Sequence, residues 1–439
     1  QYYYDAIGNK VRMYTGLSSP LTINGLDNVT PESDSNYSVT KYEYDRFGNL
    51  KKMTDPLLQY ETYTYDLNGN MIQKTDRNQN VTTMAYDGLN RLLSKSVTTP
   101  DGNGDKAYTY AYYLTGSRKS MSGDGTSVTY IYDDLGRLIQ KSEGNITRTY
   151  DYDASDNRKL FKLIKSGTTE INTTYTYDKM NRLNEVKENG QLTASYTYDD
   201  NGNRLSLAYN NDNSVSYQYN LANKLKVMTN KKGTTTLSQY SYNYYLDGNQ
   251  QKKTDHTGKV TTYVYDSLGR LTNESVTGEP AISYTYDDYN NRAAMTVAGQ
   301  YATTYCYDKN SRLITEEKAV GGVTETTRYS YDYNGNQIYK GIETLAPAGE
   351  GSTGTLAIYV SGEDAGSGIA TFNEFDGLNQ LIKTTAGDKT ITYAYNGDGL
   401  RTSKTVNGVT TKHIWDGNQI SLELNSSDVV TGKYIRGIN

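Results

Sequence analysis

The stretch Tyr63-Thr64-Tyr65-Asp66-Leu67-Asn68-Gly69-Asn70-Met71-Ile72 decides the fold, because variants of it recur along the whole 439-residue chain. Tyr63 and Tyr65 lie two residues apart, so in a strand both rings are on one face and the intervening threonine is on the other. Asp66 then opens a turn, because its short side chain accepts hydrogen bonds from backbone amides two residues on. The aliphatic Met71 begins a returning strand. The stretch therefore predicts a β-hairpin.

The hairpin recurs about eighteen times. When the aromatic residue before the acidic one is taken as the anchor, most steps between units are 20 or 21 residues, several are 24 to 26, and two are 40 and 44. A period this regular predicts an array of repeated units and not a chain of ordinary domains. The anchors are Tyr4, Tyr44, Tyr65, Tyr86, Tyr112, Tyr132, Tyr152, Tyr177, Tyr198, Tyr219, Tyr244, Tyr265, Tyr286, Tyr307, Tyr331, Phe375, Tyr395 and Trp415.

The position four residues after the anchor indicates a backbone requirement. In the seventeen regular units it is Gly ten times and Asn five times, with Asp156 and Ser311 in the other two. Gly, Asn and Asp are the residues that best tolerate a positive φ. We therefore interpret the recurring residues as a structural motif and not as binding chemistry. Its clearest members are Tyr44, Asp45, Gly48, Tyr65, Asp66, Gly69, Tyr86, Asp87, Asn90, Tyr132, Asp133, Gly136, Tyr198, Asp199, Gly202, Tyr265, Asp266 and Gly269.

Composition narrows the class of protein. Only 35% of residues are hydrophobic, and 46 of the 439 are tyrosine, which together with threonine and valine favours strands over disorder. The net charge of −5, from 45 basic and 50 acidic residues without a basic stripe, argues against a nucleic-acid partner. No run of about 18 apolar residues is present, so we expect no membrane span. These properties predict a thin, extended sheet, and no helix is expected.

The reactive side chains form no recognisable site. His256 and His413 match no zinc or triad pattern, and the single cysteine, Cys306, has no evident base beside it. Turns such as Asp66–Gly69 resemble calcium loops but lack the spacing of EF-hands or β-rolls. We therefore expect no catalytic, metal-binding or cofactor-binding residues, and no enzyme. The tyrosine rows could bind glycans, but rings in register along a whole array favour a scaffold.

The organisation predicted for the chain is a single array over residues 1–439. The array is partial at the N-terminus, where the chain begins inside a repeat, so we expect a fragment of a longer protein. Residues 15–40 form an irregular insertion or a degenerate unit, and residues 341–371, rich in Gly and Ser, form a loop within the array.

The repeats resemble the YD repeat of the rearrangement-hotspot (Rhs) proteins, the insecticidal toxin-complex proteins and the teneurins. The motif appears in Tyr44-Asp45-Arg46-Phe47-Gly48-Asn49, in Tyr132–Arg137 and in Tyr265–Arg270. This resemblance implies a sheet that spirals into a hollow shell and encloses a toxic C-terminal polypeptide, which an autoproteolytic Asp-Pro-x-Gly core releases. Residues 432–437 resemble the run-up to that core. Asp55-Pro56-Leu57-Leu58 lacks the glycine, so no cleavage residue is carried onto it.

Simple arithmetic also favours a hollow structure. About 34 strands at roughly 4.8 Å each make a ribbon of about 160 Å, or about 50 Å across if closed once, whereas about eight strands already fill a barrel. We expect one to two turns of a spiral. The leading hypothesis is a shell segment of a bacterial Rhs/YD-repeat polymorphic toxin, secreted or at the cell surface, that houses its own C-terminal cargo for delivery to competitor or host cells. The alternative is a cell-surface or cell-wall-associated adhesin that binds carbohydrate.

Overall fold

The computed structural model describes residues 1–16, 37–343 and 370–437. These residues form 37 strands and no helix, and the strands make one antiparallel sheet. Strands that follow one another in the chain pair with each other, as β5 (Tyr60–Tyr65) pairs with β6 (Met71–Thr75) and β6 with β7 (Val81–Tyr86). The prediction of an all-β array of hairpins is confirmed.

The chain divides into two compact units, each made of two separate stretches. Unit 1 comprises residues 1–110 and 284–410, and unit 2 comprises residues 111–283 and 411–439. The first stretch of unit 1 contains β1 (Tyr2–Tyr4), β2 (Lys10–Thr15), β3 (Ser38–Tyr44), β4 (Leu50–Thr54), β5, β6, β7, β8 (Leu92–Thr98) and most of β9 (Lys106–Tyr112). Its second stretch contains most of β25 (Ile282–Tyr286), then β26 (Arg292–Val297), β27 (Tyr301–Tyr307), β28 (Leu313–Val320), β29 (Val323–Tyr331), β30 (Gln337–Glu343), β31 (Thr371–Phe375), β32 (Leu381–Ala386), β33 (Lys389–Tyr395) and β34 (Arg401–Val406).

Unit 2 is built in the same way. Its first stretch contains β10 (Arg118–Gly123), β11 (Thr126–Tyr132), β12 (Leu138–Glu143), β13 (Ile146–Tyr152), β14 (Arg158–Lys165), β15 (Thr168–Tyr177), β16 (Leu183–Glu188), β17 (Gln191–Tyr198), β18 (Arg204–Tyr209), β19 (Asn213–Tyr219), β20 (Leu225–Lys232), β21 (Thr235–Tyr244), β22 (Gln250–Asp255), β23 (Val260–Tyr265) and β24 (Leu271–Val276). Its second stretch contains most of β35 (Val409–Asp416), then β36 (Gln419–Asn425) and β37 (Val430–Lys433).

Most hairpins carry a β-bulge beside their anchor residue. In the β5–β6 pair, Thr64 lies opposite Gln73 but Tyr65 lies opposite Met71, so Ile72 is an extra residue in the returning strand. The same shift precedes Tyr132 and Tyr265 in their hairpins. A bulge adds local twist and bends a strand. The simple period-two pattern did not predict it.

The turn after each anchor contains one residue in the left-handed region. All seventeen regular units have a positive φ at the fourth residue after the anchor, for example 82° at Gly69, 61° at Asn90 and 58° at Ser311. A Cβ built on Gly69 would meet nothing within 4 Å. The backbone angle, and not lack of space, therefore selects glycine there, as the substitution pattern predicts.

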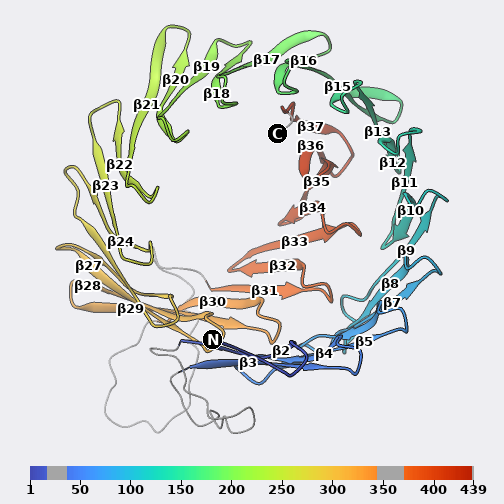
Figure 1. The fold of residues 1–439 in the computed structure, drawn as a ribbon, viewed down its shortest axis with the longest axis horizontal. Helices are drawn as coiled ribbons and strands as arrows, with labels where there is room; N and C mark the ends of the chain where they lie inside the picture. The colour runs from blue at the N-terminus through green and yellow to red at the C-terminus, as the bar shows by residue number, and fades with distance from the viewer. Residues whose placement is uncertain (17–36, 344–369, 438–439) are drawn as a thin grey trace. The chain divides into compact units, whose positions relative to one another are not determined.

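The hydrophobic core of unit 2 lies between its two stretches. Strands β35–β37 lie alongside β13–β18, on the side to which the sheet curves (Figure 1). The buried residues of this core are Ile146, Tyr150, Phe161, Leu163, Ile171, Tyr175, Leu183, Val186, Ala194, Leu207, Leu422 and Leu424. Leu163 and Leu422 are both 0% exposed, so the C-terminal hairpin closes this core completely.

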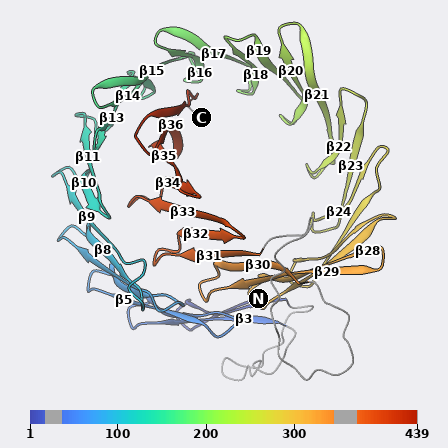
Figure 2. The ribbon, with the colours of Figure 1, turned by 180° about the vertical axis from the view of Figure 1, so that it is seen from behind.

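The two stretches of unit 1 also lie side by side (Figures 1 and 2), but the residues buried near their contacts are largely polar. Asp55 is 4% exposed, Asp76 is 7% exposed and Asp376 is 3% exposed. Buried polar groups need hydrogen-bond partners. Unit 1 therefore relies on hydrogen bonds where unit 2 relies on apolar packing.

The two irregular segments expected from the sequence fall mostly outside the described residues. Thr15 ends β2, residues 38–40 belong to β3, residues 341–343 end β30, and Thr371 begins β31. Apart from Gly16, Tyr37 and Ala370, the rest of the insertion or degenerate unit predicted within 15–40 and of the loop predicted within 341–371 lies in 17–36 and 344–369, which the structure does not describe.

Candidate functional site: the repeat turn and the tyrosine face

In thirteen of the seventeen regular repeats an aspartate follows the anchor, and it organises its own turn. The backbone amides of Asn68 and Asn70 donate to Asp66 Oδ1, at 2.9 Å each, and the Asn70 side-chain amide donates to Asp66 Oδ2 at 2.8 Å. Where arginine replaces the asparagine, Arg91 Nε donates to Asp87 Oδ2 at 2.7 Å. The carboxylates of Asp66 and Asp87 each accept three hydrogen bonds inside their own turns. This arrangement suits a structural role better than acid–base chemistry.

The charge state of these aspartates agrees with that role. Hydrogen bonds from the Asn70 side chain, followed by those from backbone amides, hold the pKa of Asp66 below its ordinary value. The backbone amide and then the guanidinium of Arg91 lower the pKa of Asp87. A carboxyl with a lowered pKa stays ionised and is a poor proton donor near neutral pH.

The other motif residues named from the sequence occupy equivalent places. Asp45, Asp133, Asp199 and Asp266 accept hydrogen bonds from the residue four positions on, and Gly48, Gly136, Gly202 and Gly269 have positive φ angles. Each Tyr-Asp-Gly set is brought together within one hairpin. The sets stay in separate turns, one per repeat.

In twelve repeats the hydroxyl of the anchor tyrosine joins the repeat to the one before it, a bond that was not predicted from the sequence. Tyr65 Oη donates to the carbonyl of Leu50 at 2.9 Å, and Leu50 is the first residue of the preceding unit's returning strand. The same bond recurs from Tyr44, Tyr86, Tyr152, Tyr177, Tyr198, Tyr219, Tyr244, Tyr265, Tyr307, Tyr331 and Tyr395. The sequence did carry a signal for this hydrogen bond, because sixteen of the eighteen anchors are tyrosine and only one is phenylalanine.

The tyrosine two residues before the anchor lies on the same face, which we call the tyrosine face. Its partner across the hairpin changes along unit 2. Beneath the C-terminal hairpin the pairs are Tyr150–Phe161, Tyr175–Val186 and Tyr196–Leu207. Elsewhere in unit 2 they include Tyr130–Lys141, Tyr242–Lys253 and Tyr263–Glu274. The face is therefore apolar where the chain covers it, and it carries Lys or Glu at these other repeats.

The last repeat uses its aspartate differently. Tyr150 Oη donates to Asp416 Oδ1 at 3.0 Å, and Arg158 Nη1 donates to Asp416 Oδ2 at 2.7 Å. Arg148 Nε donates to the Trp415 carbonyl at 2.6 Å, and the Arg148 side chain is 2% exposed. Burial raises the pKa of Tyr150, so its hydroxyl remains a donor. Asp416, which follows Trp415, thus binds the C-terminal hairpin to the tyrosine face.

The residues excluded as catalytic from the sequence lie apart from one another. His256 is exposed in a turn, Cys306 is exposed on β27, and His413 is buried in β35 with Nε2 4.0 Å from Glu423 Oε1. Within the described ranges, no three His, Cys, Asp or Glu side chains are grouped so as to hold a metal. In the same residues no helix is long and apolar enough to cross a membrane.

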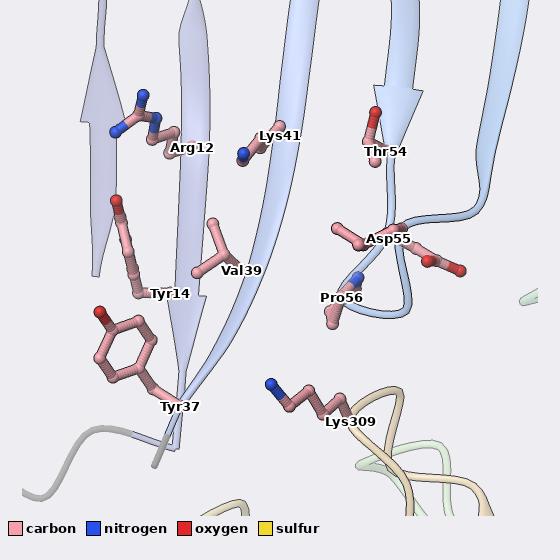
Figure 3. A pocket seen from close by; sticks show the side chains of 10 residues that line it. Arg12, Tyr14, Tyr37, Val39, Lys41, Thr54, Asp55, Pro56 and Lys309 are labelled. Carbon is pink, nitrogen blue, oxygen red and sulfur yellow. The ribbon is translucent and has the colours of Figure 1, made fainter. Parts of the chain in front are cut away.

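A cavity of about 330 Å³ in unit 1 lies among the first strands and the turn after β27 (Figure 3). Arg12, Lys41 and Lys309 line it together with the rings of Tyr14 and Tyr37, which meet edge to face with their centroids 5.7 Å apart. The carboxylate in its lining belongs to Asp55, which accepts the amide of Leu57 and the side chain of Asn310, both at 2.9 Å. That carboxylate is therefore held by the fold.

Comparison with known families agrees with the repeat. A model described as teneurin YD-shell matches residues 161–296, and a model described as RHS repeat matches residues 62–103. No curated protein matches the chain. The two family matches confirm the resemblance to the Rhs/YD-repeat family.

Solved structures share the fold. The Tc holotoxin pore of Photorhabdus luminescens, carrying a TccC3 mutation, aligns with 98% of this chain and 24% of its own at 16% identity and a TM-score of 0.59. The crystal structure of TcdB2-TccC3-TEV aligns with 97% of this chain and 24% of its own at 15% identity and a TM-score of 0.53. This chain spans about a quarter of the length of those chains.

Proposed function

We propose that the chain is a structural shell segment that holds and protects polypeptide on its tyrosine face. One observation carries the proposal: this face already holds a piece of polypeptide, namely the β35–β36 hairpin. Leu422 and Leu424, at 0% and 2% exposed, pack onto β13–β18, and Asp416 binds Tyr150 and Arg158. The repeat thus provides a face suited to an extended chain.

The remaining part of this face suits a guest that must later leave. At two of the repeats that the hairpin does not cover, Lys253 and Glu274 lie opposite the tyrosine, and Lys253 also lies over a ring, 5.8 Å from Tyr240. Exposed cation–π and charge pairs contribute about 0.5–1 kcal/mol each. Such weak contacts would keep a guest soluble without binding it permanently.

The more specific role that we propose is a segment of a bacterial Rhs/YD-repeat toxin. Its sheet would wind into a hollow spiral around a C-terminal toxin cargo, and the assembly would be secreted or displayed at the cell surface. The repeat matches and the shared fold with Tc toxin structures support this role. The same matches are to structural repeats, which supports a role without catalysis in this chain.

The carbohydrate-binding alternative has less support. A glycan-binding row needs free hydroxyls and exposed rings, but the anchor hydroxyls donate to backbone carbonyls in the preceding repeat, as Tyr65 does to Leu50. The aspartates beside them are engaged in their turns, as Asp66 is with Asn70. Both groups that would recognise a sugar are therefore used by the fold.

Proteolysis of the intact natural protein tests the proposal. The reading frame around residues 1–439 would be expressed whole, digested with a nonspecific protease, and compared with the same C-terminal polypeptide expressed without the sheet. We expect the polypeptide beyond Asn439 to survive as long as the sheet stays folded, and to be cut rapidly alone. Equal cleavage in both samples, or glycan-array binding lost on removing exposed tyrosines, would overturn the proposal in favour of a displayed scaffold.

A further inference from the structure

Two turns of unit 1 that are far apart in the sequence join by exchanging asparagine side chains. The turn Asp76–Asn80 links β6 to β7, and the turn Asp332–Asn336 follows the anchor of β29. Asn334 Nδ2 donates to Asp76 Oδ2 at 2.8 Å, and Asn78 Nδ2 donates to Asp332 Oδ2 at 2.9 Å. Each asparagine is the third residue of its own turn and enters the carboxylate of the other turn.

The exchange is reciprocal at the backbone as well. Asn334 Oδ1 accepts the amide of Arg77 at 3.0 Å, and Asn78 Oδ1 accepts the amide of Tyr333 at 3.0 Å. Both turns have the same shape, with a positive φ at the fourth residue, 65° at Gln79 and 94° at Gly335. An Asp-x-Asn turn is thus complementary to another turn of its own kind.

Neighbouring turns show which residues the exchange requires. Asn310, the third residue of its turn, donates to Asp55 Oδ2 at 2.9 Å, but the third residue of the facing turn is Leu57, which has no side-chain amide to return. One repeat further, where Leu378 takes that position, the turn meets Gly104 through a backbone bond, from Gly377 N to the Gly104 carbonyl at 3.4 Å. The side-chain bonds therefore follow the third-position asparagines.

Two other turns have the same five-residue pattern as Asp332–Asn336, Asp-x-Asn-Gly-Asn: residues 66–70 and 199–203. All three also make the same sideways contact with the next repeat. Asn334 Nδ2 donates to Asn379 at 2.8 Å, Asn68 Nδ2 to Asn90 at 3.2 Å, and Asn201 Nδ2 to Asn223 at 3.4 Å. Asn334 is half-buried by its exchange, whereas Asn68 and Asn201 are exposed.

We infer that the turns 66–70 and 199–203 are docking sites for a linking turn of sequence Asp-x-Asn-x-Asn at the edge of another stretch of YD-repeat sheet. Each would receive that turn as 332–336 receives 76–80, by the same exchange of two asparagine amides. The inference deepens the proposed shell function, because it names the side chains that hold one layer of repeats to the next.

A peptide that copies the known partner tests this inference directly. Residues 74–82 would be closed between two added cysteines and titrated into the full chain carrying Cys306→Ser and labelled with ¹⁵N-asparagine. The side-chain amide signals of Asn68 and Asn201 would be assigned from Asn68→Ser and Asn201→Ser. The matched control is the same peptide with Asn78→Leu, which copies the natural leucine at position 57.

We expect saturating shifts at Asn68 and Asn201, and binding at least about tenfold weaker for the control peptide. Asn334, whose site is filled, should not shift. Equal binding of the two peptides, a shift at Asn334 as large as at Asn68, or no shift at millimolar peptide would overturn the inference. None of these outcomes depends on a cargo, so a protected C-terminal polypeptide with unresponsive turns would leave the shell function standing and reject this docking rule alone.

Discussion

Later parts of this chain cover earlier repeats in two different ways. In unit 1 the contact is between turns, and it consists of hydrogen bonds such as those between Asn334 and Asp76. In unit 2 the contact is on the tyrosine face, and it consists of apolar side chains around Leu422, with Asp416 as a polar anchor. The two contacts use different parts of the repeat. The contact in unit 1 uses the regular turns, and the contact in unit 2 uses the variable residue that pairs with the first tyrosine.

The difference shows where a YD repeat can vary. The turn aspartate, the left-handed residue and the anchor hydroxyl build and join the hairpins, so each of these positions accepts only a few residue types within this chain. The residue opposite the first tyrosine makes none of these contacts, and it varies in character between repeats, from the apolar Phe161 to the charged Glu274. Each repeat can therefore make its part of the tyrosine face apolar or charged without altering the sheet.

The largest effect should come from removing apolar bulk under the hairpin. Phe161 is 4% exposed and stacks on Tyr150, with ring centroids 5.6 Å apart. We expect Phe161→Ala to lower the free energy of unfolding by about 3–5 kcal/mol, through lost burial and a cavity. Glu274→Ala, at the equivalent position of an uncovered repeat, should change it by less than about 0.5 kcal/mol. Urea unfolding followed by circular dichroism measures both, and similar losses would remove the distinction between covered and uncovered repeats.

Removing the Asp416 carboxylate, which holds the C-terminal hairpin, should have the second-largest effect on stability. Asp416→Ala leaves the partly buried Arg158 without its carboxylate and Tyr150 without its acceptor, so we expect a loss of about 2–4 kcal/mol. Trp415 is the single tryptophan of the chain, and its emission reports directly on the hairpin. The emission should shift to the red at lower urea in Asp416→Ala. An unchanged Trp415 transition would show that apolar packing alone holds the hairpin.

The turn contact of unit 1 should be weaker than the face contact of unit 2. Asn334→Leu removes hydrogen bonds to Asp76, Arg77 and Asn78. We therefore expect the free energy of opening this turn contact to fall by about 1–3 kcal/mol. Amide hydrogen exchange at Arg77 and Asn78 should become faster. Asn201→Leu, in a turn of the same Asp-x-Asn-Gly-Asn pattern with an exposed asparagine, serves as the control. Equal effects of the two substitutions would mean that the exchange contributes nothing beyond turn formation.

The left-handed position should tolerate some residues and reject others. Gly69→Val forces a β-branched residue to φ 82° and should cost about 1–3 kcal/mol. Gly69→Asn should cost much less, because asparagine fills this position in five other repeats. Melting curves of the two variants give the comparison, and an unchanged curve for Gly69→Val would contradict the turn assignment.

Acid should weaken the turns before it weakens the apolar core. The pKa values of Asp66, Asp153 and Asp199 are lowered, chiefly by the side chains of Asn70, Asn157 and Asn203. Their contribution to stability is complete above the unfolded pKa of about 3.9 and is lost as the pH falls through the lower folded value. Protonation of one aspartate destabilises its turn only slightly, but the same loss occurs in many turns. Exchange rates measured from pH 5 downward should rise first at the turns; an earlier rise in β36 would contradict this order.

The repeat was predictable because its signals are local and occur many times. Seventeen copies of one position disclosed the positive φ, and alternation disclosed the strands. The extra residue Ile72 could not be found this way, since a bulge depends on how two strands pair. The ion pair that holds the C-terminal hairpin joins Asp416 to Arg158, 258 residues away. In the sequence, Asp416 follows an aromatic residue just as the turn aspartates do. Contacts between distant copies of one motif leave almost no trace in the motif itself.

An electron cryomicroscopy map of the intact natural protein tests the central claim, that the tyrosine face holds polypeptide, most directly. We expect density for additional chain against the tyrosine face of the uncovered repeats, beside residues such as Tyr263 and Glu274, and a bare opposite face. A map in which the tyrosine face is empty, or in which partner density lies only on the opposite face, would contradict it.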